Sequence, residues 1–351
     1  MGADRETRAA MAPLRFKGAP GSPYTRKMLA LLRFRQLPHE LLIGNHVETD
    51  GLPSPKVSLL PTFYLPNAAG ELEAVVDSTP LIRRFEAEYT GRSVIPPDPV
   101  LAFLDYLLED YADEWLTKAM FHYRWYYAAD IDKAGRILPL WREPGMDDAR
   151  HAELARAFSG RQISRLYVVG SNDVTAPVIE ASYKRFLAIM EALVRRQSFL
   201  MGARPGASDF GVYAQLTQLA KFDPTPMALC LAEAPRVFAW VDLVDDLSGL
   251  PTADDGWLSR GEARSVLGDL LAEAGRTYVP AMLANAAALA KGEKQWQTTI
   301  DGQRWVQPSF PYQGRCLGWI RERFAALTGD DQRAVREILA DTGCETLLEG
   351  T

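Results

Sequence analysis

Residues 17–27 read Lys-Gly-Ala-Pro-Gly-Ser-Pro-Tyr-Thr-Arg-Lys, and this stretch decides the fold of the first part of the chain. It predicts a strand that ends at the first glycine, a loop rich in glycine and proline, and a helix over 22–35. Pro23 is suited to the first helical position, and the Ser22 hydroxyl can cap the free amides of the first turn. The four residues Ser-Pro-Tyr-Thr that begin at Ser22 have the frame of a Cys-Pro-Tyr-Cys redox motif, with a hydroxyl in place of each thiol.

The segment from 13 to 95 alternates strand and helix patterns. A helix between the first two strands makes them parallel, because a parallel pair needs a long crossover connection. The next two strands are joined by the turn-rich run Pro-Asn-Ala-Ala-Gly, which predicts a hairpin. In order, the pattern predicts a strand over 14–18, a helix over 22–35, a strand over 39–43, paired strands over 62–65 and 73–77, and a helix over 78–89. This is the order of a thioredoxin-like fold.

Three short motifs lie in this segment: the helix start at Ser22, the pair Leu60-Pro61 before a strand, and the pair Asp77-Ser78 at the next helix start. With the element order, they resemble the glutathione transferase superfamily, whose N-terminal domain has the thioredoxin fold. The resemblance implies a cis Pro61, with the backbone of Leu60 bound to the cysteinyl unit of glutathione. It also implies that Asp77 holds the γ-glutamyl ammonium and Ser78 the carboxylate, which suits a helix N-terminus.

Glutathione chemistry requires a thiolate, and a free thiol with a pKa of about 8.5 is mostly protonated at pH 7. A helix N-terminus supplies roughly 0.3–2 kcal/mol of preference for an anion, and a hydrogen bond to a charged group about 1.5–3 kcal/mol. The Ser22 hydroxyl can therefore activate the thiol without acting as a nucleophile. Tyr24 and Thr25 are rivals for this role, and the alternative is that Ser22 only caps the helix. Because the first domain contains no cysteine, a thiol oxidoreductase is disfavoured.

Few residues outside these motifs could bind an anion or a metal. Lys56 and His46 stand where a cation for the glycyl carboxylate of glutathione is expected, although both fit solvated surface positions as well. The sequence has no phosphate-binding glycine loop and no Cys-x-x-Cys motif. The histidines are too dispersed for a metal site, so we predict no metal.

After a stiff linker over 91–99, the pattern becomes helical. We predict helices over 99–128, 147–165, 174–198, 207–220 and 234–247. Gly206 and Asp209 resemble the capping box of the superfamily, but glycine stands where serine or threonine is usual, so half of the reciprocal hydrogen bonding is lost. An α/β domain followed by an all-helical one is the plan of glutathione transferases.

The first helix of this second part is rich in aromatic and acidic residues. Tyr111, Trp115 and His122 fall near one stripe at helical spacing. The resemblance implies that this helix forms one wall of an acceptor pocket, and core packing is the alternative for these aromatics. Acids four residues apart, such as Glu109 and Asp113, repel one another on an isolated helix. We therefore expect some of these acids to meet basic partners across an interface.

Residues 251–351 lie outside that plan. A good hairpin pattern surrounds Asp301-Gly302, and predicted helices over 260–289, 311–327 and 330–339 flank it. If this extension covers the cleft, it restricts the site to one specialised substrate or closes it. The predicted parts are a thioredoxin-like glutathione-binding domain over 13–95, an all-helical domain over 96–250 and a mostly helical extension over 251–351.

The chain has 351 residues, 47% of them hydrophobic and 24% charged, with a formal net charge of -6. This composition fits a globular protein of two or three domains, and the negative charge argues against nucleic-acid binding. No apolar run of about 18 residues would span a membrane, and the first residues lack the apolar core of a signal peptide. Three scattered cysteines give no disulfide framework, so we expect a reduced, cytoplasmic protein.

These features lead us to expect a glutathione S-transferase-like enzyme that uses glutathione as co-substrate to attack an apolar electrophilic small molecule. The resemblance also implies a homodimer. The sequence does not separate conjugation, ether or halide displacement, and isomerisation. The alternative is a non-catalytic binding or scaffold protein that keeps the fold with a vestigial glutathione site.

Overall fold

The computed structural model describes residues 12–44 and 51–349. Its N-terminal part is a four-stranded sheet in the order β2-β1-β3-β4. β1 pairs with β2 in parallel and with β3 antiparallel, and β4 completes a hairpin with β3. The elements are β1 (Leu14–Lys17), α2 (Pro23–Arg35), β2 (His39–Leu42), β3 (Thr62–Pro66), β4 (Leu72–Val75) and α3 (Ser78–Glu88). The thioredoxin-like order predicted from the sequence is confirmed.

Aromatic contacts join the sheet to α3. The rings of Phe16 on β1 and Phe63 on β3 stack at 4.6 Å, and Phe85 of α3 meets Phe63 edge-on at 5.4 Å. All three side chains are fully buried, so each removes a large apolar area from water. These contacts hold α3 against the sheet.

The second part is helical and differs from the prediction in three places. The helix expected over 99–128 is α4 (Pro99–Tyr111), a π-helical turn η1 (Ala112–Leu116) and α5 (Thr117–Tyr126) in succession. Two helices were not predicted, α6 (Ala128–Leu140) and α10 (Pro224–Glu233), because proline and glycine weaken their patterns. The remaining elements are α7 (Asp148–Ile163), the short η2 (Leu166–Val169), α8 (Ala176–Val194), α9 (Ala207–Leu219) and α11 (Pro235–Val244).

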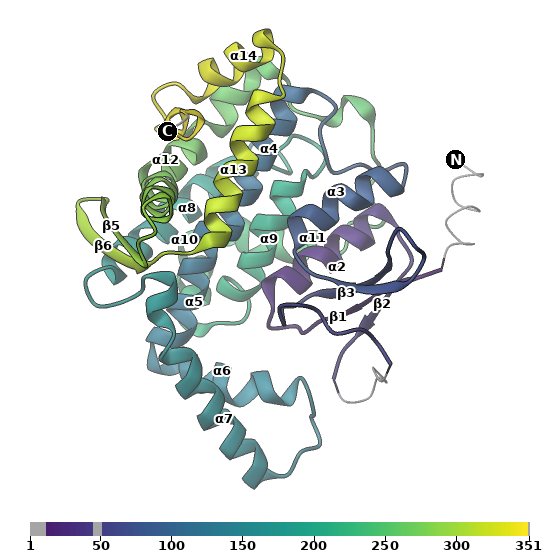
Figure 1. Cartoon of the computed structure of the whole chain (residues 1–351), viewed down its shortest axis with the longest axis vertical. Coiled ribbons are helices and arrows are strands. Elements are labelled where there is room, and N and C mark those ends of the chain that lie inside the picture. Colours follow the sequence, from purple (N-terminus) through teal and green to yellow (C-terminus); the bar gives the residue numbers. More distant parts are fainter. Residues whose placement is uncertain (1–11, 45–50, 350–351) are drawn as a thin grey trace.

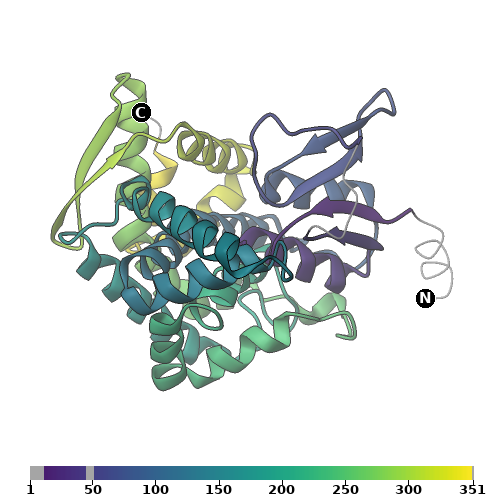
Figure 2. The same cartoon turned by 90° about the horizontal axis from the view of Figure 1, so that it is seen from below.

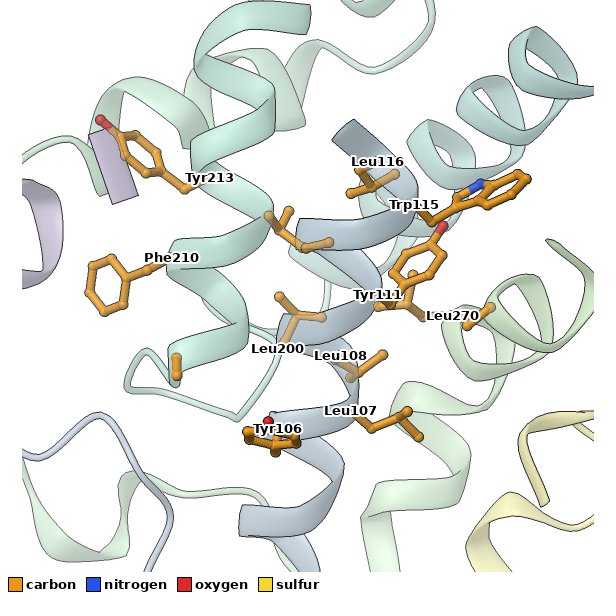
Figure 3. Close-up of a cluster of buried hydrophobic side chains, with 14 of the residues drawn as sticks. Tyr106, Leu107, Leu108, Tyr111, Trp115, Leu116, Leu200, Phe210, Tyr213 and Leu270 are labelled. Carbon is orange, nitrogen blue, oxygen red and sulfur yellow. The ribbon is translucent and has the colours of Figure 1, made fainter. Parts of the chain in front are cut away.

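The α4–η1 helix runs through the centre of the molecule (Figure 1). On one side it packs against α9, which in turn packs against α2. On another side, Tyr111 points toward Leu270 of the extension and Trp115 lies on the same side of the helix (Figure 3). All three of these side chains are buried in one continuous core. This helix therefore joins the N-terminal domain to the extension.

The start of α9 shows how the chain compensates for Gly206. Asp209 accepts a hydrogen bond from the Gly206 amide at 2.9 Å, as a capping box requires. The missing hydroxyl is replaced by Asp105 of α4, which accepts from the amides of Ala207 and Ser208 at 3.2 and 2.9 Å. A Cβ at position 206 would stand 2.3 Å from Asp105 Oδ1, so glycine leaves the space that the carboxylate occupies.

The extension lies along α4 and α8. It comprises η3 (Asp254–Gly256), α12 (Arg260–Ala290), the hairpin β5 (Gln295–Ile300) and β6 (Gln303–Pro308), α13 (Pro311–Ala325), α14 (Gly329–Leu339) and η4 (Cys344–Leu348). Asp301 and Gly302 both have positive φ, as a tight two-residue hairpin turn requires. α13 runs between α12 and the N-terminal domain (Figures 1 and 2). Among the described helices, none combines the length and the apolar character needed to cross a membrane.

Candidate active site

Ser22 is the N-cap of α2, and its hydroxyl makes two hydrogen bonds. Its oxygen accepts from the Thr25 amide at 3.2 Å, and its proton is donated to the carbonyl oxygen of Leu60 at 3.3 Å. The second bond is long, so a stronger acceptor can take the proton at little cost. Ser22 therefore caps its helix and keeps a donor that can be redirected.

Tyr24 and Thr25, the two rivals of Ser22, use their hydroxyls inside the protein. The Tyr24 hydroxyl donates to the backbone oxygen of Asp113 at 2.8 Å. Burial, together with the carboxylates of Asp113 and Glu114, raises the pKa of Tyr24 well above its usual value. Thr25 is 1% exposed, and its hydroxyl accepts from the Ala19 amide at 3.3 Å. Of the three hydroxyls, that of Ser22 is the one bonded to the loop before β3.

The Leu60–Pro61 bond is cis and leads directly into β3. This geometry places the Leu60 carbonyl against Ser22, so the loop before β3 and the start of α2 share one small region. Lys56, on the same loop, is exposed to solvent. His46, the other candidate cation for the glycyl carboxylate, lies outside the described residues.

Asp77 and Ser78 stand at the start of α3, as predicted. Asp77 is the N-cap and has a φ of 85°, a strained conformation for a residue with a side chain. Ser78 is buried, and its hydroxyl accepts a hydrogen bond from the Lys27 ammonium at 3.2 Å. Because Ser78 accepts from Lys27, its own proton is available to donate to another group.

Lys27 is a residue of this region that sequence reasoning missed. It is fully buried, and its ammonium contacts Glu109 at 2.7 Å and Asp113 at 2.5 Å. Burial lowers the pKa of Lys27, but the two carboxylates outweigh it and the pKa lies above its usual value. Arg83 of α3 also pairs with Glu109. The sequence does carry a signal for this residue, because Lys27 stands among the apolar residues of its helix. Together with the expectation that the acids have basic partners, that position could have predicted a buried lysine.

The three side chains predicted to line the acceptor pocket lie in the core instead. Tyr111 meets Tyr278 of α12 edge-on at 6.0 Å, and the indole of Trp115 donates to the Ser182 hydroxyl at 2.8 Å. His122 is fully buried against Ser171. The prediction of a pocket on this helix face is wrong, because Tyr278 of α12 packs on Tyr111, Trp305 of β6 packs on Trp115, and the segment up to α8 covers His122.

A cavity of about 390 Å³ lies near the start of α2, and Leu60, whose carbonyl accepts from Ser22, is one of the residues that line it. Leu60 and the loop after β1 form one side of it, and Leu138, Trp141 and Arg142 at the end of α6 form another. Gly21, directly before Ser22, allows this approach, because a Cβ there would stand 2.5 Å from Leu138 and 2.9 Å from Trp141. Leucine, isoleucine and tryptophan side chains line it together with Lys17 and Arg142, so the cavity can hold a small, partly apolar molecule near the start of α2.

The chain has a thioredoxin-like domain followed by a helical domain, and a serine-capped helix lies beside a cis proline. This is the architecture of the transferase class of proteins. Two family models match the sequence: the glutathione S-transferase N-terminal domain over residues 17–93 and the C-terminal domain over residues 152–243. The chain belongs to the glutathione S-transferase superfamily. The matched segments lie within the first two predicted domains, and neither reaches the extension. A comparison with curated proteins finds no significant match.

Several solved structures resemble this chain at low sequence identity. A glutathione S-transferase from Methylobacterium radiotolerans, in complex with glutathione sulfonate, is 19% identical, covers 70% of this chain and 95% of its own, and has a TM-score of 0.39. A beta-etherase from a Sphingobium strain is 16% identical over 67% and 95%, with a TM-score of 0.45. A maleylacetoacetate isomerase from Anaeromyxobacter dehalogenans, with bound glutathione, is 17% identical over 66% and 89%, with a TM-score of 0.37.

Proposed function

We propose that this chain is a glutathione-dependent transferase that activates the glutathione thiol at Ser22 for attack on an electrophilic small molecule. The observation that carries the proposal is the position of the Ser22 hydroxyl. It lies at the N-terminus of α2, within hydrogen-bond reach of the carbonyl of Leu60, which precedes the cis proline and also lines the nearby cavity. Superfamily membership supports glutathione as the thiol.

In the proposed reaction, Ser22 gives up its long bond to Leu60 and donates to the sulfur. The helix N-terminus and this hydrogen bond favour the thiolate, so the thiol proton leaves to water. A sulfur lone pair then forms the bond to the electrophilic atom of the acceptor. In a substitution, the bond to the leaving group breaks with its electron pair, whereas in an addition the pair moves to the neighbouring atom of the acceptor. Ser22 stays protonated throughout.

The γ-glutamyl end of glutathione is assigned to the start of α3. Asp77 is partly exposed and can accept from the ammonium. Ser78 can donate to the carboxylate, because Lys27 already occupies its acceptor side. We assign the acceptor molecule to the cavity beside Trp141. A homodimer remains the oligomeric state that the resemblance implies.

Calorimetric titration with glutathione tests the proposal. The wild-type protein should bind, and Ser78→Ala should weaken binding by roughly tenfold, since it removes one hydrogen bond to a charged group. Ultraviolet titration of the bound thiol should show a pKa about one unit higher in Ser22→Ala than in the wild type. Ser259→Ala is the matched control, because it also removes an N-cap hydroxyl, but from α12 in the extension.

Each result separates the alternatives. No binding to the wild-type protein would overturn the transferase and favour the binding or scaffold protein with a vestigial site. Binding with an unchanged thiol pKa in Ser22→Ala would move activation to another group. A pKa change of equal size in Ser259→Ala would mean that the change does not come from the Ser22 hydroxyl.

A further inference from the structure

The extension reaches the proposed γ-glutamyl site through one tyrosine. The hydroxyl of Tyr312, near the start of α13, donates to Asp77 Oδ2 at 2.8 Å. The two residues are 235 positions apart in the sequence, and Tyr312 lies beyond both segments matched by the family models. The extension therefore contributes a contact to the start of α3 that the two matched domains do not supply.

The position of Tyr312 is fixed by its neighbours on α13. The ring of Trp319 meets it edge-on at 6.2 Å, and the Arg315 guanidinium lies 5.2 Å from its centroid. Gln313, the residue after Tyr312, donates to Glu114 at 2.9 Å, which holds the first turn of α13 against the α4–η1 helix. A hydroxyl held in this way can orient its acceptor without further loss of conformational entropy.

Asp77 benefits from such support, because its carboxylate has little local stabilisation beyond the backbone of Thr79. It is the N-cap of α3, yet its carboxylate makes no capping hydrogen bond to the helix, and its backbone has a positive φ. Burial raises the pKa of Asp77, whereas the Tyr312 hydroxyl, Lys27 and Arg315 each lower it and so favour the ionised form. A carboxylate has about four acceptor positions, so the bond from Tyr312 leaves room for an ammonium on the exposed side.

We propose that Tyr312 is a positioning residue of the γ-glutamyl site: it orients the Asp77 carboxylate toward the ammonium of the ligand, so that tight binding of a γ-glutamyl compound requires the docked extension. The inference rests on the proposed function, since it takes Asp77 as the ammonium acceptor. It also has a reciprocal consequence. If docking of α13 strengthens ligand binding, the ligand must strengthen docking of α13 by the same factor.

The test is a cycle of one substitution and one change in the ligand. Tyr312→Phe removes the hydroxyl and keeps the ring. The probes are S-methylglutathione and its deamino analogue, in which a glutaryl group replaces γ-glutamyl and the ammonium is absent. Tyr312→Phe should raise the Kd of S-methylglutathione by about fivefold to tenfold, which is the range for loss of part of a charged hydrogen bond. The Kd of the deamino analogue should not change.

Tyr278→Phe is the matched control. Tyr278 also belongs to the extension, and its hydroxyl donates to a carboxylate of α4, Asp110, at 2.5 Å. Removal of that hydroxyl should leave the Kd of both probes unchanged. An equal loss of affinity for both probes in Tyr312→Phe would mean that Tyr312 has only a structural role, and would overturn the inference. Tighter binding of S-methylglutathione in this variant would also overturn it, because Tyr312 would then compete with the ammonium for Asp77.

The inference and the proposed function fail in different ways. If the wild type binds S-methylglutathione and Asp77→Asn weakens it, but Tyr312→Phe does not, then only the role of Tyr312 is overturned. If the wild type binds neither probe, then the proposed function fails and the inference fails with it.

Discussion

Two faces of the α4–η1 helix hold buried carboxylates in opposite ways. The face toward the N-terminal domain carries Glu109 and Asp113, and cations meet them there. Lys27 contacts both carboxylates, and Arg83 pairs with Glu109. Burial raises the pKa of Glu109, but Arg83 and Lys27 more than offset it and lower the pKa to about 2. Glu109 is therefore held as an anion.

The face toward the extension carries Asp110 and Glu114, one residue further along in each case. Their hydrogen bonds come from uncharged donors, the hydroxyl of Tyr278 and the amide of Gln313. Burial raises the pKa of Asp110 to about 7 and that of Glu114 to about 8, with the other acids of the helix adding to the effect. These two carboxyl groups are held as neutral acids at moderate pH.

The two faces of the α4–η1 helix therefore differ in the conditions under which the N-terminal domain and the extension could separate from them. Separating the N-terminal domain from α4 would leave ion pairs without partners, and an unpaired buried charge is expensive at any pH. On the face toward the extension, Asp110 and Glu114 are neutral carboxyl groups that lose protons within an accessible pH range, while ion pairs such as Arg185 with Glu273 attach the extension elsewhere. Glu109 therefore stays charged on one face, whereas both carboxyl groups on the other face respond to pH.

The largest expected effect comes from breaking the charged face. Lys27→Met would leave Glu109 and Asp113 buried without the ammonium, and should lower the free energy of unfolding by about 3–5 kcal/mol in chemical denaturation. The matched control is Lys118→Met, a buried lysine that donates to the neutral Gln307 at 3.0 Å. Burial lowers the pKa of Lys118 to about 8, so its charge is poorly stabilised and its loss should cost at most about 1 kcal/mol.

Equal losses in Lys27→Met and Lys118→Met would contradict the comparison. In the Lys27→Met background, Asp113→Asn should restore part of the loss, because it removes the charge left without a partner while Glu109 keeps its pair with Arg83.

A smaller effect is expected from packing on the extension side. Gly275 of α12 stands one turn before Tyr278, and a Cβ there would lie 1.8 Å from the carbonyl oxygen of Thr342. Since the obstacle is backbone, Gly275→Ala should destabilise the protein by about 1–3 kcal/mol. Gly268, in the same helix, has nothing within 4 Å of its Cβ position, so Gly268→Ala should stabilise by up to about 1 kcal/mol. Thermal unfolding of both variants checks the prediction, and a stabilising Gly275→Ala would refute it.

The sequence allowed the order of elements to be predicted because its signals are local. Pro23 after a serine and Asp301-Gly302 between two strand patterns fix element ends within a few residues. The sequence also predicted that some acids of the α4–η1 helix pair with basic residues, because like charges four residues apart repel one another. Lys27 confirms this prediction for Glu109 and Asp113.

What could not be predicted depends on contacts between distant segments. Helical spacing shows that Tyr111 and Trp115 share a face, but not that α12 covers that face. The bond from Tyr312 to Asp77 depends on how α13 docks, which no local pattern records. The sequence correctly predicted that Gly206 supplies no capping hydroxyl. That Asp105 of α4 accepts from the first amides of α9 instead could be seen only in the packed structure. For Ser22, the sequence identified a helix cap, and its role toward a thiol remains a prediction.

The smallest expected effect concerns the pH response of the extension side. Asp110 and Glu114 have higher pKa values when folded than when unfolded, so the folded protein binds more protons between about pH 5 and pH 8. Stability should therefore fall as the pH rises through this range, by about 1 kcal/mol per pH unit for each group at most. Lys118, with a pKa lowered to about 8, acts in the opposite direction above pH 8, which sets the upper limit of the window.

A double variant isolates this pair from other buried acids such as Asp113, whose pKa is raised to about 6 by burial. Asp110→Asn with Glu114→Gln keeps the acceptor oxygens for Tyr278 and Gln313, but removes the protons that titrate. The free energy of unfolding should therefore fall less steeply with pH in the variant than in the wild type. The gap between the two curves should widen toward pH 8. Parallel curves would mean that Asp110 and Glu114 do not take up extra protons in the folded protein, and the contrast between the two faces would be lost.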